Sequence, residues 1–66
     1  MRILIENGPP HELLTVAGSW SNDPLEGKVF TSIIGALKAA SHAGIERFNL
    51  VFIGAQAKPF LKLNYR

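Results

Sequence analysis

The sequence contains no cysteine and only two histidines, His11 and His42. The absence of cysteine excludes disulfides and thiolate metal sites, and a structural zinc site would need four ligands. No stretch approaches the ~18 apolar residues that span a bilayer, and the apolar run after residue 1 is too short for a signal peptide. We therefore expect a cytoplasmic protein with no metal, no cofactor and no membrane association.

The chain is also short, with 66 residues of which 47% are hydrophobic. Such a chain makes one small domain, in which folding buries only about 60% of the unfolded surface. Below roughly 70–80 residues a single core supplies only ~3–5 kcal/mol. Because disulfides and structural metals are excluded, association with another chain is the remaining source of stability. We expect a homo-oligomer, with a dimer as the leading form, and a protein partner as a further option.

Three segments have the composition of β-strands: residues 2–6, 48–53 and 60–65. Residues 48–53 place large apolar side chains on both faces, with Phe48, Leu50 and Phe52 on one and Val51 and Ile53 on the other. Residues 60–65 have one more polar face, which indicates an edge strand. Two alternatives are open for residues 11–17, a strand or a short helix, and Thr15 and Val16 favour the strand. Residues 18–22 are expected to form a loop.

A long amphipathic helix is expected over residues 24–43. Asp23 suits the N-cap, Pro24 the first helical position, and Glu26 the closing position of a capping box. Gly44 supplies the stop, with Ile45 at the position that often packs against the cap. The apolar residues expected on one face of this helix are Leu25, Val29, Phe30, Ile33, Ile34, Leu37 and Ala40.

These elements predict an α+β fold, a small single domain in the order ββαββ with an antiparallel sheet packed on one amphipathic helix. If residues 11–17 are helical, the order becomes βααββ. One helix covers one sheet face, so the second face needs another cover. Small residues also recur every four positions on the outer side of the expected helix, where they would let another backbone approach. The candidate oligomer interface is therefore Gly27, Thr31, Gly35, Ala39, Val51 and Ile53.

No catalytic motif is complete. The pair His11-Glu12 begins a zinc-protease motif whose second histidine is missing, no G-x-S-x-G elbow is present, and aspartate occurs once. We expect a non-catalytic interaction protein, a regulator, inhibitor or assembly subunit that binds a partner macromolecule.

The basic carboxy-terminal part suggests two alternatives. Residues 38–66 carry five cations and one acid, and interleaved cations and aromatics are typical of nucleic-acid-binding sheets. Alternation nevertheless places Phe60 and Tyr65 on opposite faces. Candidate residues for a partner or nucleic acid are Trp20, Lys58, Phe60, Lys62, Tyr65 and Arg66. A small anionic ligand bound at a subunit interface would contact Lys28, Lys38 and His42.

Overall fold

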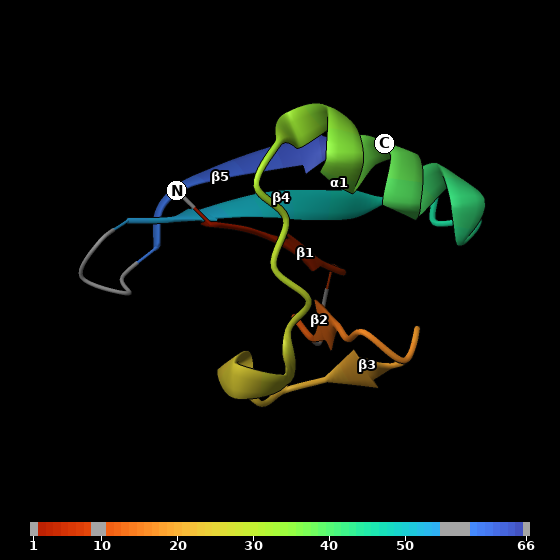
Figure 1. The fold of residues 1–66 in the computed structure, drawn as a ribbon, viewed down its shortest axis with the longest axis horizontal. Coiled ribbons are helices and arrows are strands. Elements are labelled where there is room, and N and C mark those ends of the chain that lie inside the picture. Colours follow the sequence, from red (N-terminus) through yellow and green to blue (C-terminus); the bar gives the residue numbers. More distant parts are fainter. Residues whose placement is uncertain (1, 9–10, 55–58, 66) are drawn as a thin grey trace.

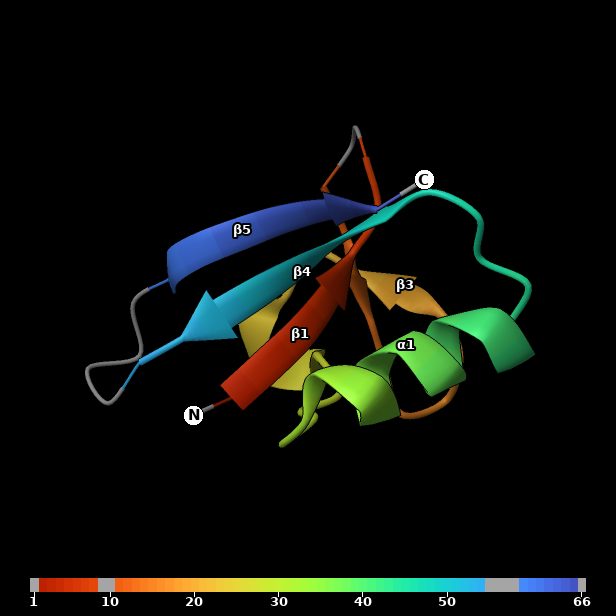
Figure 2. The ribbon, with the colours of Figure 1, turned by 90° about the horizontal axis from the view of Figure 1, so that it is seen from above.

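Within residues 2–8, 11–54 and 59–65, which the computed structural model describes, the chain forms five strands and one α-helix. The strands are β1 (Arg2–Glu6), β2 (Leu13–Leu14), β3 (Trp20–Ser21), β4 (Phe48–Ile53) and β5 (Pro59–Tyr65). A short 3-10 helix, η1 (Pro24–Glu26), and the α-helix α1 (Ile33–His42) lie between β3 and β4. The strands make one antiparallel sheet in the order β3-β2-β1-β4-β5, and α1 lies alongside β1 (Figures 1 and 2). The predicted α+β class, an antiparallel sheet with one helix, is confirmed.

The centre of the sheet is the antiparallel pair β1–β4, in register from Arg2 opposite Ile53 to Glu6 opposite Asn49. The bounds predicted for β1 and β4 are confirmed, and β5 is an edge strand that pairs with β4, as predicted. We call the side on which α1 packs the helix face. On it lie Ile3, Ile5 and Leu50, which are fully buried with Ala36 and Ala40 of α1. We call the opposite side, which holds Val51, the second face.

The predicted helix over residues 24–43 forms only in its second half, as α1, because the chain is extended between η1 and α1. In that extended segment Phe30 exchanges two backbone hydrogen bonds with Ile3, of 2.9 and 2.8 Å, and the Lys28 amide donates to the Leu14 carbonyl at 2.8 Å. Gly27 forms a further bridge with Thr15. These long-range bonds satisfy backbone groups that a helix would satisfy locally. The apolar face expected over residues 24–43 therefore does not exist as one stripe.

The residue expected to cap one long helix caps the short helix η1 instead, and α1 has a cap of its own. Asp23 caps η1, since its Oδ1 accepts a hydrogen bond of 2.9 Å from the Leu25 amide. Glu26 closes no capping box and accepts instead from the Ser21 hydroxyl. The helix α1 begins at a second cap, Ser32, whose Oγ accepts from the Gly35 amide at 3.0 Å.

The end of α1 matches the prediction. Gly44 has a φ of 72°, its amide donates to the Ser41 carbonyl, and the Ile45 amide donates to the Ala40 carbonyl at 2.9 Å. This pair of bonds is the Schellman arrangement, in which glycine takes the left-handed conformation without strain. Ile45 packs against the core cluster, as expected.

Removing the cap of α1 should destabilise the protein. Ser32→Ala deletes the acceptor for the Gly35 amide, so we expect a loss of about 1 kcal/mol of unfolding free energy. Ser41→Ala, an exposed position on the same helix, is the matched control and should change it by less than about 0.5 kcal/mol. Urea titrations followed by circular dichroism would measure both. Equal effects of the two substitutions would contradict the assigned helix start.

Two further expectations about the first half of the chain are now resolved. The strand alternative for residues 11–17 is confirmed in part, as β2 with a bridge at Thr15, and the helix alternative is wrong. The loop expected over residues 18–22 contains the short strand β3, because Trp20 pairs with Leu14 and Ser21 with Leu13. The sequence also predicts a turn over residues 54–59, but residues 55–58 lie outside the described part of the chain.

The chain covers much of its own second face, contrary to the expectation that it has no element to spare. Figure 1 shows η1 on the opposite side of β1 from α1. Gly27 lies so close to this face that an added Cβ would be 3.2 Å from Leu13 Cδ1 and 3.4 Å from Leu4 Cδ2. Val51 is only 5% exposed in the isolated chain. Because the expected helix is interrupted, the segment before α1 covers this face. A second copy of the chain is therefore not needed to bury the second face.

Candidate functional site

The row of small residues predicted as an oligomer interface does not form one surface. Gly27 lies in the extended segment against the second face, and Thr31 is exposed just before α1. Gly35 and Ala39 belong to α1, where Ala39 packs against the core cluster. The remaining two candidates, Val51 and Ile53, lie on the second face, buried and half-buried. The four-residue spacing would align these residues on one surface only if the helix were continuous. The helix is interrupted, so they are not aligned.

The residues predicted to bind nucleic acid are also separated. Trp20 lies on β3, at one edge of the sheet, while Lys62 and Tyr65 lie on β5, at the other. The Tyr65 ring is stacked on Phe48, with centroids 5.3 Å apart and planes 7° apart. Lys58, Arg66 and the side chain of Phe60 lie outside what the structure describes. The described members therefore form no single stacking platform.

The three residues predicted for an anionic ligand are divided between two elements. Lys38 and His42 are exposed and four positions apart on α1, which places them on the same side of the helix. Lys28 lies in the extended segment, and its Nζ is 5.2 Å from the centre of the Phe30 ring.

A nearly buried carboxylate on the second face is the polar group that sequence reasoning missed. Glu6, only 9% exposed, accepts a hydrogen bond of 3.1 Å from Asn49 Nδ2 at Oε1. Lys62 Nζ lies 3.0 Å from the same oxygen, and His11 Nδ1 lies 3.4 Å from it. Asn64 Nδ2 in turn donates to Asn49 Oδ1 at 3.0 Å. The sheet register brings these groups together, since Glu6 is opposite Asn49 and Asn49 is opposite Asn64.

These partners keep the Glu6 carboxylate ionised at neutral pH. Burial raises the pKa of Glu6, because the charged form loses hydration. Hydrogen bonds from Lys62, Asn49 and His11, together with the positive charge of Lys62, lower it by more. The net result is a pKa below the usual range, so the group is a weak general base at neutral pH.

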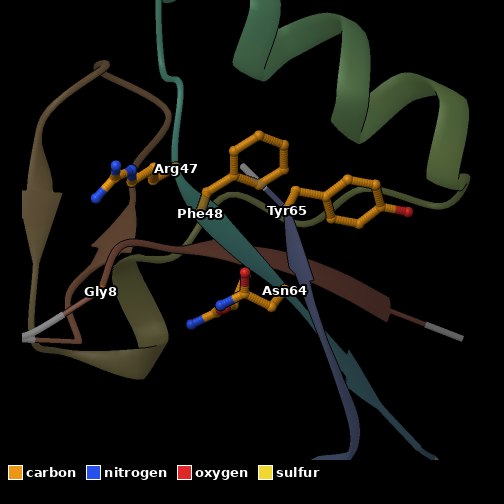
Figure 3. Close-up of a pocket in the computed structure, with 6 residues that line it drawn as sticks. Gly8, Arg47, Phe48, Asn64 and Tyr65 are labelled. Carbon is orange, nitrogen blue, oxygen red and sulfur yellow. The ribbon is translucent and has the colours of Figure 1, made fainter.

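Two hollows flank this network. The first has a volume of about 350 Å³ and is lined by Gly8, Arg47, Phe48, Asn49, Asn64 and Tyr65. Figure 3 shows the Phe48 and Tyr65 rings on the α1 side of the strands and Asn64 on the other side. This hollow therefore lies around the start of β4 and the end of β5.

The second hollow, of about 290 Å³, lies on the second face between the sheet and η1, and we call it the Glu6 cavity. Its wall is mostly apolar, and Glu6 and His11 contribute its titratable groups. The residues that line it are Leu4, Glu6, His11, Leu13, Asn22, Pro24, Val51 and Ile53.

Among the side chains that the structure describes, six large aliphatic ones are exposed, which the sequence pattern did not indicate. The most exposed is Leu25, at 93%, because η1 turns it away from the core. Val29, Ile33 and Ile34 are exposed around the start of α1, with Ile34 at 67%. The other two are Val16 and Leu61.

A sequence signal for the second-face network did exist. Alternation from Leu4 places Glu6 on its face, and alternation from Val51 places Asn49 on the same face of β4. Polar residues at matching ends of two apolar strands indicate a polar end to that face. Their adjacency could not be read from the sequence, because it depends on the strand register.

The described part of the chain contains neither a metal-binding cluster nor a membrane-spanning helix. No three His, Asp or Glu side chains there converge as a metal site would require, and no helix has the length and apolarity needed to cross a membrane. Comparison with known proteins gives no match to any protein-family model, any curated protein or any solved structure.

Proposed function

We propose that this chain is a small non-catalytic interaction protein that self-associates, and that it acts as a regulator, inhibitor or assembly subunit of a partner macromolecule. The observation that carries the proposal is the group of exposed aliphatic side chains at the start of α1. Scattered exposed apolar residues are ordinary on protein surfaces. A contiguous apolar patch on a small chain more often marks an interaction site.

One further exposed aliphatic side chain, Leu61, lies on the sheet. Leu61 is opposite Phe52, Phe52 is opposite Ile3, and Ile3 is bridged to Phe30, which precedes α1 by three residues. Leu61 is therefore on the helix face, at the end of the sheet where α1 begins. We call Val29, Ile33, Ile34 and Leu61 together the aliphatic surface. Its members come from α1, the segment before it and the open edge strand, so a partner could contact all three.

The non-catalytic part of the proposal rests on the sequence and on Glu6. The sequence has no complete catalytic motif. Glu6 is the most enclosed acid among the described residues, and Lys62 and Asn49 hold its carboxylate in the charged form. These contacts favour the charged carboxylate over the protonated one.

A charge placed on the aliphatic surface should weaken self-association. Ile34→Glu puts a carboxylate at an exposed apolar position, and we expect the dissociation constant to rise about tenfold or more, equivalent to ~1.4 kcal/mol. Sedimentation equilibrium over a range of concentrations would measure it, and circular dichroism would confirm that the variant is folded. Ser41→Glu adds the same charge at an exposed polar position of α1 and should leave association unchanged. A wild-type chain that remains monomeric at every concentration would refute self-association.

A further inference from the structure

The Glu6 cavity combines an apolar wall with one ionised group. Leu4, Leu13 and Val51 are buried on the second face and form one cluster with the half-buried Ile53. All four line the cavity, and Pro24 of η1 lies across from them. The volume of about 290 Å³ is close to the lower end of the range for small-molecule sites, which begins at roughly 300 Å³. Such a space suits a short aliphatic chain.

The Glu6 carboxylate is the polar anchor in this cavity. The contacts recorded for it from Lys62, Asn49 and His11 all engage Oε1. Lys62 lies on β5, and the cavity lies on the other side of the carboxylate, towards β2 and η1. Among the described residues the contacts of Glu6 are all at Oε1, which leaves Oε2 for a ligand. His11, whose side chain is 57% exposed, also lines the cavity.

Charge decides which ligand fits. Lys62 offsets part of the charge of Glu6 from the β5 side, but the described residues that line the cavity include Glu6 and no Lys or Arg, so an anion has no cationic partner there. A purely apolar molecule would remove water from the carboxylate without replacing its hydrogen bonds, which is costly. An ammonium group satisfies the carboxylate with a charge-assisted hydrogen bond. We propose that the Glu6 cavity binds a small aliphatic primary amine, with its ammonium group at Glu6 and its carbon chain against Leu4, Leu13 and Val51.

This site is separate from the proposed self-association surface, because none of the four residues of the aliphatic surface lines the cavity. The same chemistry could come from a free amine or from a lysine side chain of a peptide. Both present an ammonium group on a short methylene chain, so a test needs one probe of each kind.

The test is a titration of the wild-type protein with n-butylammonium, n-butanol and butyrate, followed by amide chemical shifts in NMR spectra. We expect butylammonium to shift the amides of Leu4, Glu6 and Val51 and to bind about tenfold more tightly than butanol, since charged hydrogen bonds are the stronger ones. Butyrate should bind least. Nα-acetyl-lysine methylamide is the second amine probe, and the tighter of the two amines identifies the source of the ligand.

Two variants separate the charge from the cavity. Glu6→Gln keeps the side-chain shape and should make butylammonium and butanol bind equally, whereas Glu46→Gln, an exposed acid outside the cavity, should keep the preference. Ile53→Phe fills the apolar wall, leaves Glu6 in place and should weaken both ligands. Butanol binding as tightly as butylammonium to the wild type would overturn the proposal, as would the absence of binding. If Glu6→Gln fails to fold, two results still test the proposal: the comparison of butylammonium with butanol on the wild type, and the binding of both ligands to Ile53→Phe.

Discussion

Leu50→Ala is expected to leave much of the protein unfolded at 25 °C. Leu50 is fully buried in β4, between β1 and β5, and packs in the core cluster with Ile3 and Ile5. Truncating a buried leucine costs ~2–5 kcal/mol, because it removes apolar contacts and leaves a cavity. That loss is comparable to the ~3–5 kcal/mol that a single core supplies in a domain of this size. Far-ultraviolet circular dichroism and urea titration would show a reduced or absent folding transition.

Leu25→Ala is the matched control, since it makes the same chemical change at a side chain that is 93% exposed. We expect it to alter the unfolding free energy by no more than about 0.5 kcal/mol. A continuous helix over residues 24–43 would have placed both leucines in the core. Equal losses of unfolding free energy at the two positions would therefore support a continuous helix and contradict the observed break after η1.

Glu6→Gln is expected to lower stability at neutral pH by ~1.5–3 kcal/mol, the usual range for hydrogen bonds to a charged group. The pKa of Glu6 is lower in the folded state than its ordinary value of 4.5. The ionised carboxylate therefore stabilises the fold above that value, and the contribution is lost as the pH falls through the lowered folded-state pKa. Glutamine cannot ionise, so the variant should lose less stability on acidification than the wild type does.

The measurement is the urea midpoint of both proteins at several values between about pH 3 and pH 7, where carboxylates titrate. The two curves should converge at the acidic end and separate towards neutral pH. Glu46→Gln, at an exposed position, should follow the wild type throughout. A constant gap between Glu6→Gln and the wild type at every pH would show that the charge of Glu6 has no role in stability.

The features that could be predicted from the sequence are those with local causes. The alternation of apolar side chains in residues 48–53 depends on neighbouring residues alone, and β4 has the predicted bounds. The same is true of Gly44, which ends α1 through bonds within five positions of itself. Such signals can be read before any tertiary structure is known.

The start of the helix could not be predicted, because two local signals compete and long-range bonds decide between them. Asp23-Pro24-Leu25-Glu26 does begin a helix, but only the short η1. The pairing of Phe30 with Ile3 then holds the chain extended until Ser32 supplies a second cap. The spacing of apolar residues from 25 to 34 imitates a helical stripe, although the exposed Leu25 and Ile34 are not part of the core.

The polar network on the second face depends entirely on strand order. Glu6 and Asn49 are 43 positions apart, and Asn64 joins them only because β5 is next to β4. Alternation predicts the face on which each one lies. It cannot predict that they are neighbours, and so the Glu6 cavity was not among the predicted sites.

The pairing of β1 with β4 also sets the order of events when the chain folds. β1 precedes β4 in the chain, and its partners on β4 lie from 43 positions (Glu6 and Asn49) to 51 positions (Arg2 and Ile53) further along. Closing so long a loop precedes any gain from pairing, and such non-local contacts slow folding relative to helical proteins of similar size. On the ribosome, Leu4 and Ile5 therefore lack their β4 partners until that strand has been synthesised, although Ile3 and Glu6 can already pair with Phe30 and Leu13. During that interval a strand that ends up at the centre of the sheet is an exposed apolar segment, and chaperones that hold such segments would act at this stage.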